Sequence, residues 1–130
     1  MLPKFQRLRH SRDFSKVYRL GRKGVSPHFV VRVWDNPVEG HGENRQSALQ
    51  RSEVGRVGIV VSQKVSKRAV VRNRLKRQVR AIMAQLLPQL RPRLWVVINL
   101  RPTAEQCEYG DFLQELEQLF TQLEVFHGHS

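Results

Sequence analysis

The sequence predicts a single-domain α+β fold in which three amphipathic helices pack on a small β-sheet. Three short segments are rich in β-branched and aromatic residues, and three longer ones place apolar residues at helical spacing. A chain of 130 residues, 40% of them hydrophobic, has enough apolar material for one core and too little for two. We therefore expect one domain over residues 1–130, with a flexible connection at about 36–53 and a C-terminal tail at about 126–130.

The three expected strands are residues 28–34, 56–61 and 94–99. The first lies between Pro27 and a turn-forming Asp-Asn-Pro, and Arg32 is an exception within it because the other residues near it are apolar. Two prolines, Pro88 and Pro92, precede the third strand. The connection after the first strand has no sustained apolar periodicity, and we assign it no function.

The three expected helices are residues 11–20, 66–87 and 111–125, with Ser11, Ser66 and Asp111 as their expected N-caps. The last helix carries one apolar face, formed by Leu113, Leu116, Leu119, Phe120 and Leu123. This face would suit a dimer interface as well, but a domain short of core is expected to use it to cover the sheet.

The acidic side chains of the last helix, Glu115, Glu117 and Glu124, fall outside its apolar face and are expected to form a polar surface. A protein nuclease would need grouped carboxylates to hold a metal, or a base near a phosphate. Asp13 is isolated in a basic segment, and no paired carboxylates occur on adjoining strands. We therefore expect no catalytic residue in the protein itself.

The charge of the chain is high and unevenly distributed. There are 23 Lys+Arg against 11 Asp+Glu, a net charge of +12. Residues 1–34 hold 9 basic and 1 acidic side chains, residues 62–93 hold 10 and none, and residues 94–130 hold 1 and 6. Concentrated positive charge is typical of proteins that bind polyanions, so we expect a nucleic-acid ligand and not a membrane.

The helix expected over residues 66–87 carries most of this argument. Its apolar positions fall on one stripe, formed by Val71, Leu75, Val79, Ile82 and Leu86. The rest of its circumference is basic, without an acidic partner. Like charges at i,i+4 destabilise a helix by a few tenths of a kcal/mol per pair, which a bound polyanion would offset. Solvated charged faces usually mix signs, so the pattern favours binding over a solvated surface.

Arginine predominates over lysine on this helix, which suits planar, bidentate contacts with phosphate. A-form grooves restrict direct reading of bases, so a helix with several basic faces fits structured RNA better than DNA. No apolar run reaches the roughly 20 residues that span a bilayer, and no signal peptide is recognisable, so we expect a cytoplasmic protein. Cys107 is the single cysteine, and the five histidines are scattered, with His127 and His129 in the expected tail. These residues form no recognisable metal-ligand pattern, so we expect no structural zinc or other metal site.

The stretch from Arg56 to Arg80, with an Arg-Asn-Arg core at residues 72–74, resembles the hallmark of the bacterial ribonuclease P protein family. Arg7-Leu8-Arg9, Asp13-Phe14, Phe29-Val30-Val31 and residues 96–99 occur in the family's order, so the resemblance covers most of residues 5–125. It implies an α/β sandwich of the ribosomal protein S5 domain 2-like type. Its mostly antiparallel sheet would have about four strands, with three helices and a left-handed βαβ crossover that the general right-handed preference would not predict.

The resemblance also implies a division of labour between protein and RNA. The catalytic RNase P RNA would remove the 5′ leader of precursor tRNA with Mg²⁺ bound chiefly by that RNA, and no organic cofactor is expected. The implied RNA-binding residues of the protein are Lys64, Lys67, Arg68, Arg72, Asn73, Arg74, Lys76, Arg77 and Arg80. The implied leader-binding residues are Phe14, Tyr18, Val30 and Arg32, and Lys64 would complete their groove.

Two alternatives stay open at this point. Phe14 would suit core packing as well as leader contact. A ribosomal-type structural RNA-binding protein would explain the charge, although not the ordered flanking motifs. The chain also departs from many relatives: Arg32 replaces an aromatic, Ala81 replaces an acidic or polar residue, and residues 36–53 form a longer connection. Arg32 would instead contact a leader phosphate or stack through its guanidinium plane.

Overall fold

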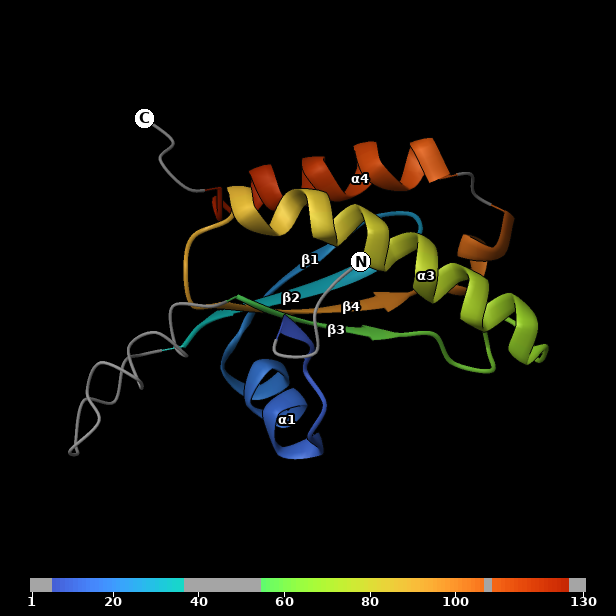
Figure 1. Cartoon of the computed structure of the whole chain (residues 1–130), viewed down its shortest axis with the longest axis horizontal. Coiled ribbons are helices and arrows are strands. Elements are labelled where there is room, and N and C mark those ends of the chain that lie inside the picture. The colour runs from blue at the N-terminus through green and yellow to red at the C-terminus, as the bar shows by residue number, and fades with distance from the viewer. Residues whose placement is uncertain (1–5, 37–54, 107–108, 127–130) are drawn as a thin grey trace.

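Two layers of helices enclose one four-stranded sheet in the computed structural model, which describes residues 6–36, 55–106 and 109–126 (Figure 1). The elements in chain order are α1 (Ser11–Leu20), β1 (Arg22–Val25), β2 (Phe29–Asp35), β3 (Arg56–Val60), α3 (Ala69–Leu86), β4 (Leu94–Leu100) and α4 (Tyr109–Gln122). Two short 3₁₀ turns, η2 (Leu87–Gln89) and η3 (Pro102–Gln106), follow α3 and β4. The predicted α+β class is confirmed.

The sheet is mixed, with strand order β1-β2-β4-β3. β2 pairs antiparallel with β1 and with β4, whereas β3 pairs parallel with β4, so the predicted mostly antiparallel sheet is confirmed. The parallel pair is joined by α3, which packs back across the sheet as parallel neighbours require. Consequently the carboxyl ends of β3 and β4 lie at the same end of the sheet, where the chain leaves β3 and enters α3 (Figure 1).

The main core lies between the sheet and the pair α3 and α4 (Figure 1). Alternate residues of β2 and β4 face it, as the two-residue period of a strand requires. From α3 it receives Val71, Leu75, Val79, Ile82, Met83 and Leu86. The predicted stripe of the basic helix is therefore confirmed, and α4 covers the sheet as expected, with Leu116, Leu119 and Phe120 buried.

A smaller apolar cluster lies on the opposite face of the sheet, between the sheet and α1. Figure 1 shows α1 on that face, away from α3 and α4. Its buried members are Leu8, Val17, Trp95 and Val97, and Phe14, Trp34 and Val60 are half-buried against them. The face is only partly apolar, because Arg32, Asn99 and Arg56 share it by strand alternation. These three polar side chains are only partly buried, so this part of the face is not closed by the apolar cluster.

β1 was not among the strands expected from the sequence. Its residues Arg-Lys-Gly-Val contain one apolar side chain, so neither β propensity nor alternation marks them. The strand forms because its backbone pairs with β2 along four positions, from Arg22 opposite Val33 to Val25 opposite Val30. Gly21 permits the tight approach from α1, since a Cβ there would lie 2.7 Å from the Val33 carbonyl oxygen.

The predicted N-caps are wrong at all three helices. α1 begins at Ser11 itself, with His10 in the cap position, and α3 begins at Ala69, three residues after Ser66. α4 begins at Tyr109, so Asp111 lies inside its first turn. The differences are one residue at α1, two at α4 and two at α3, whose cap is Arg68 and not Ser66, so the predicted positions lie within one turn of the observed ones.

Some sequence predictions concern residues outside the described parts of the chain. They are the connection over residues 37–53, Cys107, and the tail from residue 127 with His127 and His129. Along the described residues no helix is both long and apolar enough to cross a membrane. The same residues contain no group of three or more His, Cys, Asp or Glu side chains placed to hold a metal ion.

Candidate nucleic-acid interface

α3 presents the predicted basic surface. Its buried stripe fixes the helix against the sheet, which leaves Asn73, Arg74 and Arg77 exposed and Arg72, Lys76 and Arg80 half-buried at the flanks. Lys64, Lys67 and Arg68 are exposed in the turn that leads into the helix. The structure thus brings all nine predicted RNA-binding residues together on α3 and the turn before it.

The first arginine of the Arg-Asn-Arg core is held in place by this turn. Arg72 Nη1 donates a 3.0 Å hydrogen bond to the carbonyl oxygen of Ser66. Ser66 is buried, and its Oγ accepts a 3.2 Å hydrogen bond from the backbone N–H of Arg68. Ser66 therefore orders the approach to the helix and orients Arg72, although it is not the N-cap.

The charge on α3 is not neutralised within the described structure. The ion pair of Arg91 with Asp35 and the contact of His28 with Glu115 both lie away from α3. α3 itself contains no acidic residue. A surface of one sign with exposed guanidinium groups is suited to phosphate, which accepts charge-assisted hydrogen bonds from arginine.

A second group of polar side chains lies on the opposite face of the sheet, beside α1. Tyr18 is 42% exposed, and its hydroxyl donates a 3.1 Å hydrogen bond to Asn99 Oδ1. The guanidinium carbon of Arg32 lies 4.7 Å from the centre of the Tyr18 ring, a cation–π contact. We call Tyr18, Arg32 and Asn99 the platform.

The register of the sheet explains this grouping. Val30 of β2 is directly opposite Asn99 of β4. Arg32 lies two residues after Val30 and therefore points to the same face of the sheet. Three of the four predicted leader-binding residues, Tyr18, Val30 and Arg32, therefore lie together. Asn99 was not among the predicted site residues, and its only sequence signal is a polar side chain in an otherwise apolar strand.

Phe14 occupies a different position from the other three. Its ring lies directly on the backbone of Gly58 in β3, where any added Cβ would collide with it. It is half-buried in the cluster that contains Leu8 and Val17. Packing is therefore an observed role of Phe14, and contact with a leader stays a prediction.

The platform and the basic surface meet at one end of the sheet. Val60 of β3 is paired with Asn99 of β4, so the carboxyl ends of the two strands coincide at the platform. The turn that holds Lys64 and Lys67 follows β3 directly and enters α3 (Figure 1). The basic turn and the platform therefore lie at the same end of the sheet.

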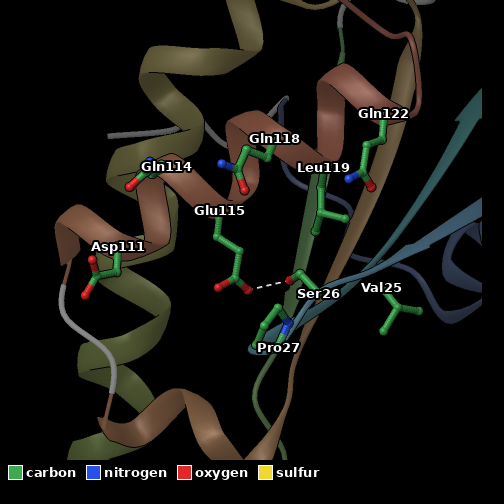
Figure 2. A pocket seen from close by; sticks show the side chains of 9 residues that line it. All are labelled: Val25, Ser26, Pro27, Asp111, Gln114, Glu115, Gln118, Leu119 and Gln122. Carbon is green, nitrogen blue, oxygen red and sulfur yellow. Dashed lines mark hydrogen bonds between the residues drawn. The ribbon is translucent and has the colours of Figure 1, made fainter.

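The polar surface of α4 differs from the sequence prediction at one residue, Glu115. Glu115 does not point to bulk solvent: its carboxylate accepts a hydrogen bond from Ser26 Oγ (Figure 2). The same oxygen accepts a 2.9 Å hydrogen bond from the backbone N–H of His28. His28 Nδ1 lies 2.7 Å from the other carboxylate oxygen. Burial raises the pKa of Glu115, but these hydrogen bonds outweigh it, so its pKa is below the ordinary value.

Glu115 also borders a hollow of about 420 Å³ between α4 and the turn after β1 (Figure 2). Its walls include Asp111, Glu115 and three glutamine side chains of α4. Carboxylates repel phosphate, so this hollow is not part of a nucleic-acid surface. The contacts of Ser26 and His28 with Glu115 attach the turn after β1 to α4 and stabilise the fold.

These features define a class of protein, a small α+β domain with a basic helix on one face of its sheet and an aromatic-arginine platform on the other. The family model described as Ribonuclease P matches residues 2–124. A ribonuclease P protein component from Cyanothece sp. is 49% identical over 131 residues, covering 99% of this chain and 100% of the relative. One from Nostoc sp. is 45% identical, with 99% of each chain covered. This chain therefore belongs to the ribonuclease P protein family.

Solved structures agree with this fold. The RNase P protein from Thermotoga maritima has a TM-score of 0.70 and 25% identity, covering 89% of this chain and 96% of its own. The Staphylococcus aureus RNase P protein has a TM-score of 0.76 over 94% of this chain and 98% of its own, and its 23% identity supports the fold alone. The predicted fold class and the predicted family are both confirmed.

Proposed function

We propose that this protein is the subunit of a ribonucleoprotein RNase P that binds the catalytic RNA through α3 and the 5′ leader of precursor tRNA at the platform. In this role it assists the Mg²⁺-dependent, endonucleolytic removal of the leader. The observation that carries the proposal is that a basic helix and the contact of exposed Tyr18 with half-buried Arg32 lie at one end of the sheet. Family membership supports it.

The contribution of α3 is electrostatic and positional. Exposed Arg74 and Arg77 would neutralise phosphates that repel one another where RNA strands approach closely. Arg72 is held by the Ser66 carbonyl, so less of its side-chain freedom is lost on binding. With the phosphates held in place, Mg²⁺ ions would populate the RNA's own site at lower concentration.

The platform suits single-stranded RNA. Tyr18 offers an exposed aromatic ring for stacking, which is worth about 1–3 kcal/mol per base and depends little on sequence. Arg32 lies over that ring, and a stacked guanidinium directs its N–H donors within its own plane, toward phosphate or base acceptors. Val30 and Lys64 would border the strand on either side.

The chemistry is assigned to the RNA. Along the described residues no carboxylate cluster is placed to hold Mg²⁺, and both proposed surfaces are cationic, which is unfavourable for a bound metal ion. The protein would supply no catalytic residue and no organic cofactor. We place the ribonucleoprotein in the cytoplasm, with no membrane or DNA partner.

The proposal is tested by cleavage of a precursor tRNA by a bacterial RNase P RNA at low Mg²⁺, with and without the protein. Correct 5′ cleavage should be stimulated by the protein, and a reaction that contains the protein alone should show no cleavage. Tight RNA binding without stimulation would overturn the proposal in favour of a structural RNA-binding role. Cleavage by the protein alone would overturn the assignment of the chemistry to RNA.

A further inference from the structure

A pocket of about 300 Å³ lies at the outer edge of the sheet beside β3, between the platform face and the α3 face. Its apolar wall includes Leu8, Phe14 and Ile59. Three arginines, Arg7, Arg9 and Arg80, line the remainder, and none of its lining residues is acidic. Neither Arg7 nor Arg9 belongs to the surfaces described above.

The three arginines are brought together by backbone pairing at this edge. Arg7 forms a parallel bridge with Val57, and the backbone N–H of Leu8 donates a 2.9 Å hydrogen bond to the Val57 carbonyl. Leu8 is buried, so the segment is anchored by both main chain and side chain. Arg80 reaches the pocket from α3, on the other side of the sheet.

The electrostatics of this pocket favour an anion. Burial and the neighbouring positive charge of Arg7 both lower the pKa of Arg80. Arginine stays protonated in proteins, so the lowered pKa reports an unfavourable environment for the charge and not its loss. A phosphate group between the guanidinium groups would relieve the repulsion and accept their hydrogen bonds.

We propose that Arg7, Arg9 and Arg80 together bind one backbone phosphodiester of RNA at the edge of β3. The inference rests on the proposed function and adds a third contact, which joins the two surfaces. Arg80 lies eight residues after Arg72 on α3, or about 12 Å along the helix axis. Phe14 is one helical turn from Tyr18, so a phosphate of the catalytic RNA or of the leader can reach the pocket.

The test uses Arg7→Gln, Arg80→Gln and the double variant, with Arg22→Gln as a matched loss of charge. Arg22 is exposed on β1, at the opposite edge of the sheet. In one arm, each protein is titrated with the catalytic RNA alone. In the other, assembled holoenzyme is titrated with precursor tRNA and with leaderless tRNA.

Each single variant should lose about tenfold in affinity, the size of one charge-assisted hydrogen bond. The double variant should lose less than the product of the single losses, because both side chains bind the same phosphate. A loss in the first arm assigns the phosphate to the catalytic RNA. A loss confined to leader-bearing precursor assigns it to the leader.

Losses equal to that of Arg22→Gln in both arms, or fully multiplicative losses, would overturn the shared pocket. If the wild-type protein binds neither RNA, the proposed function fails and the pocket fails with it. Urea unfolding shows whether each variant folds. Arg9→Gln serves as a second variant, because Arg9 is exposed and its replacement does not disturb the core.

Discussion

Tyr18 of α1 donates its hydroxyl hydrogen bond to Oδ1 of Asn99 in β4, across 81 positions of sequence. The bond holds the aromatic ring at the end of the sheet, where the Arg32 guanidinium lies over it at 4.7 Å. An aromatic ring bonded at its edge and covered on one face has few orientations left. The platform is therefore preorganised, and less ordering free energy is lost when a nucleotide binds.

Two substitutions at Tyr18 distinguish the contribution of its ring from that of its hydroxyl hydrogen bond. Tyr18→Ala should weaken the affinity of the holoenzyme for leader-bearing precursor about tenfold, because a base loses its stacking surface. Tyr18→Phe keeps the ring and should cost less than about threefold, since an exposed neutral hydrogen bond contributes little. Equilibrium titration with precursor and with leaderless tRNA measures both. An equal loss on the two RNAs would contradict a leader contact.

Arg32 should not tolerate lysine. Arg32→Lys keeps the charge but loses the planar stack on Tyr18, so leader affinity should fall while its salt dependence stays nearly unchanged. Arg32→Gln should in addition reduce the slope of log affinity against log salt by about 0.7, the value for one phosphate of a single strand. Titrations at several salt concentrations distinguish the two variants. A wild-type affinity for Arg32→Lys would show that charge alone matters.

Arg72 and Arg74 should contribute similarly to RNA binding but differently to stability. Each alanine variant should lower the slope of log affinity against log salt for the catalytic RNA by about 1, the value for one lost phosphate contact. Arg72→Ala also removes a hydrogen bond to the Ser66 carbonyl and should lower the free energy of unfolding by about 1 kcal/mol, whereas exposed Arg74 should not. Urea unfolding beside the RNA titrations tests this. An unchanged salt slope would remove that residue from the contact surface.

The parts of the fold that sequence reasoning found are those with a strong local period. The stripe of α3 is buried at every predicted position, because Val71 to Leu86 repeat at helical spacing over several turns. β1 was missed for the opposite reason: two cations and a glycine have no strand signal, and the strand exists only through its pairing with β2.

The candidate site likewise has a part that the sequence predicts and a part that it does not. Its charged residues were predictable, because an absence of acidic residues on one helix is visible in the sequence. The bond from Tyr18 to Asn99, the bridge from Arg7 to Val57 and the bonds to Glu115 join distant segments, and nothing local encodes them. Such contacts depend on the sheet register, which single-residue properties do not reveal.

Gly58 should be indispensable for the packing of Phe14. The ring of Phe14 lies on the Gly58 backbone, so Gly58→Ala must displace it or shift α1, at a cost of about 1–3 kcal/mol in the free energy of unfolding. Gly110→Ala is the matched control, since nothing lies within 4 Å of a Cβ at that position. Urea unfolding compares the two variants. An unaffected Gly58→Ala protein would show that Phe14 is not held by the sheet.

Glu115 should make the protein less stable in acid. Because its folded pKa is lower than that of an unfolded glutamate, about 4.3, the unfolded chain binds the proton more tightly. The stabilisation is present above that value and is lost as pH falls through the folded pKa. Glu115→Gln should cost about 1 kcal/mol at pH 7, and the difference from wild type should shrink as the pH is lowered toward 3.

Urea unfolding of wild type and Glu115→Gln at a series of pH values measures this difference. Glu117→Gln is the control, because Glu117 is exposed on the same helix and its replacement should leave the acid dependence unchanged. A difference between wild type and Glu115→Gln that stays constant with pH would mean that the carboxylate is not stabilised by Ser26 and His28. If the difference in the free energy of unfolding from wild type decreases with falling pH for Glu115→Gln and not for Glu117→Gln, the acid sensitivity lies at the contact between α4 and the turn after β1.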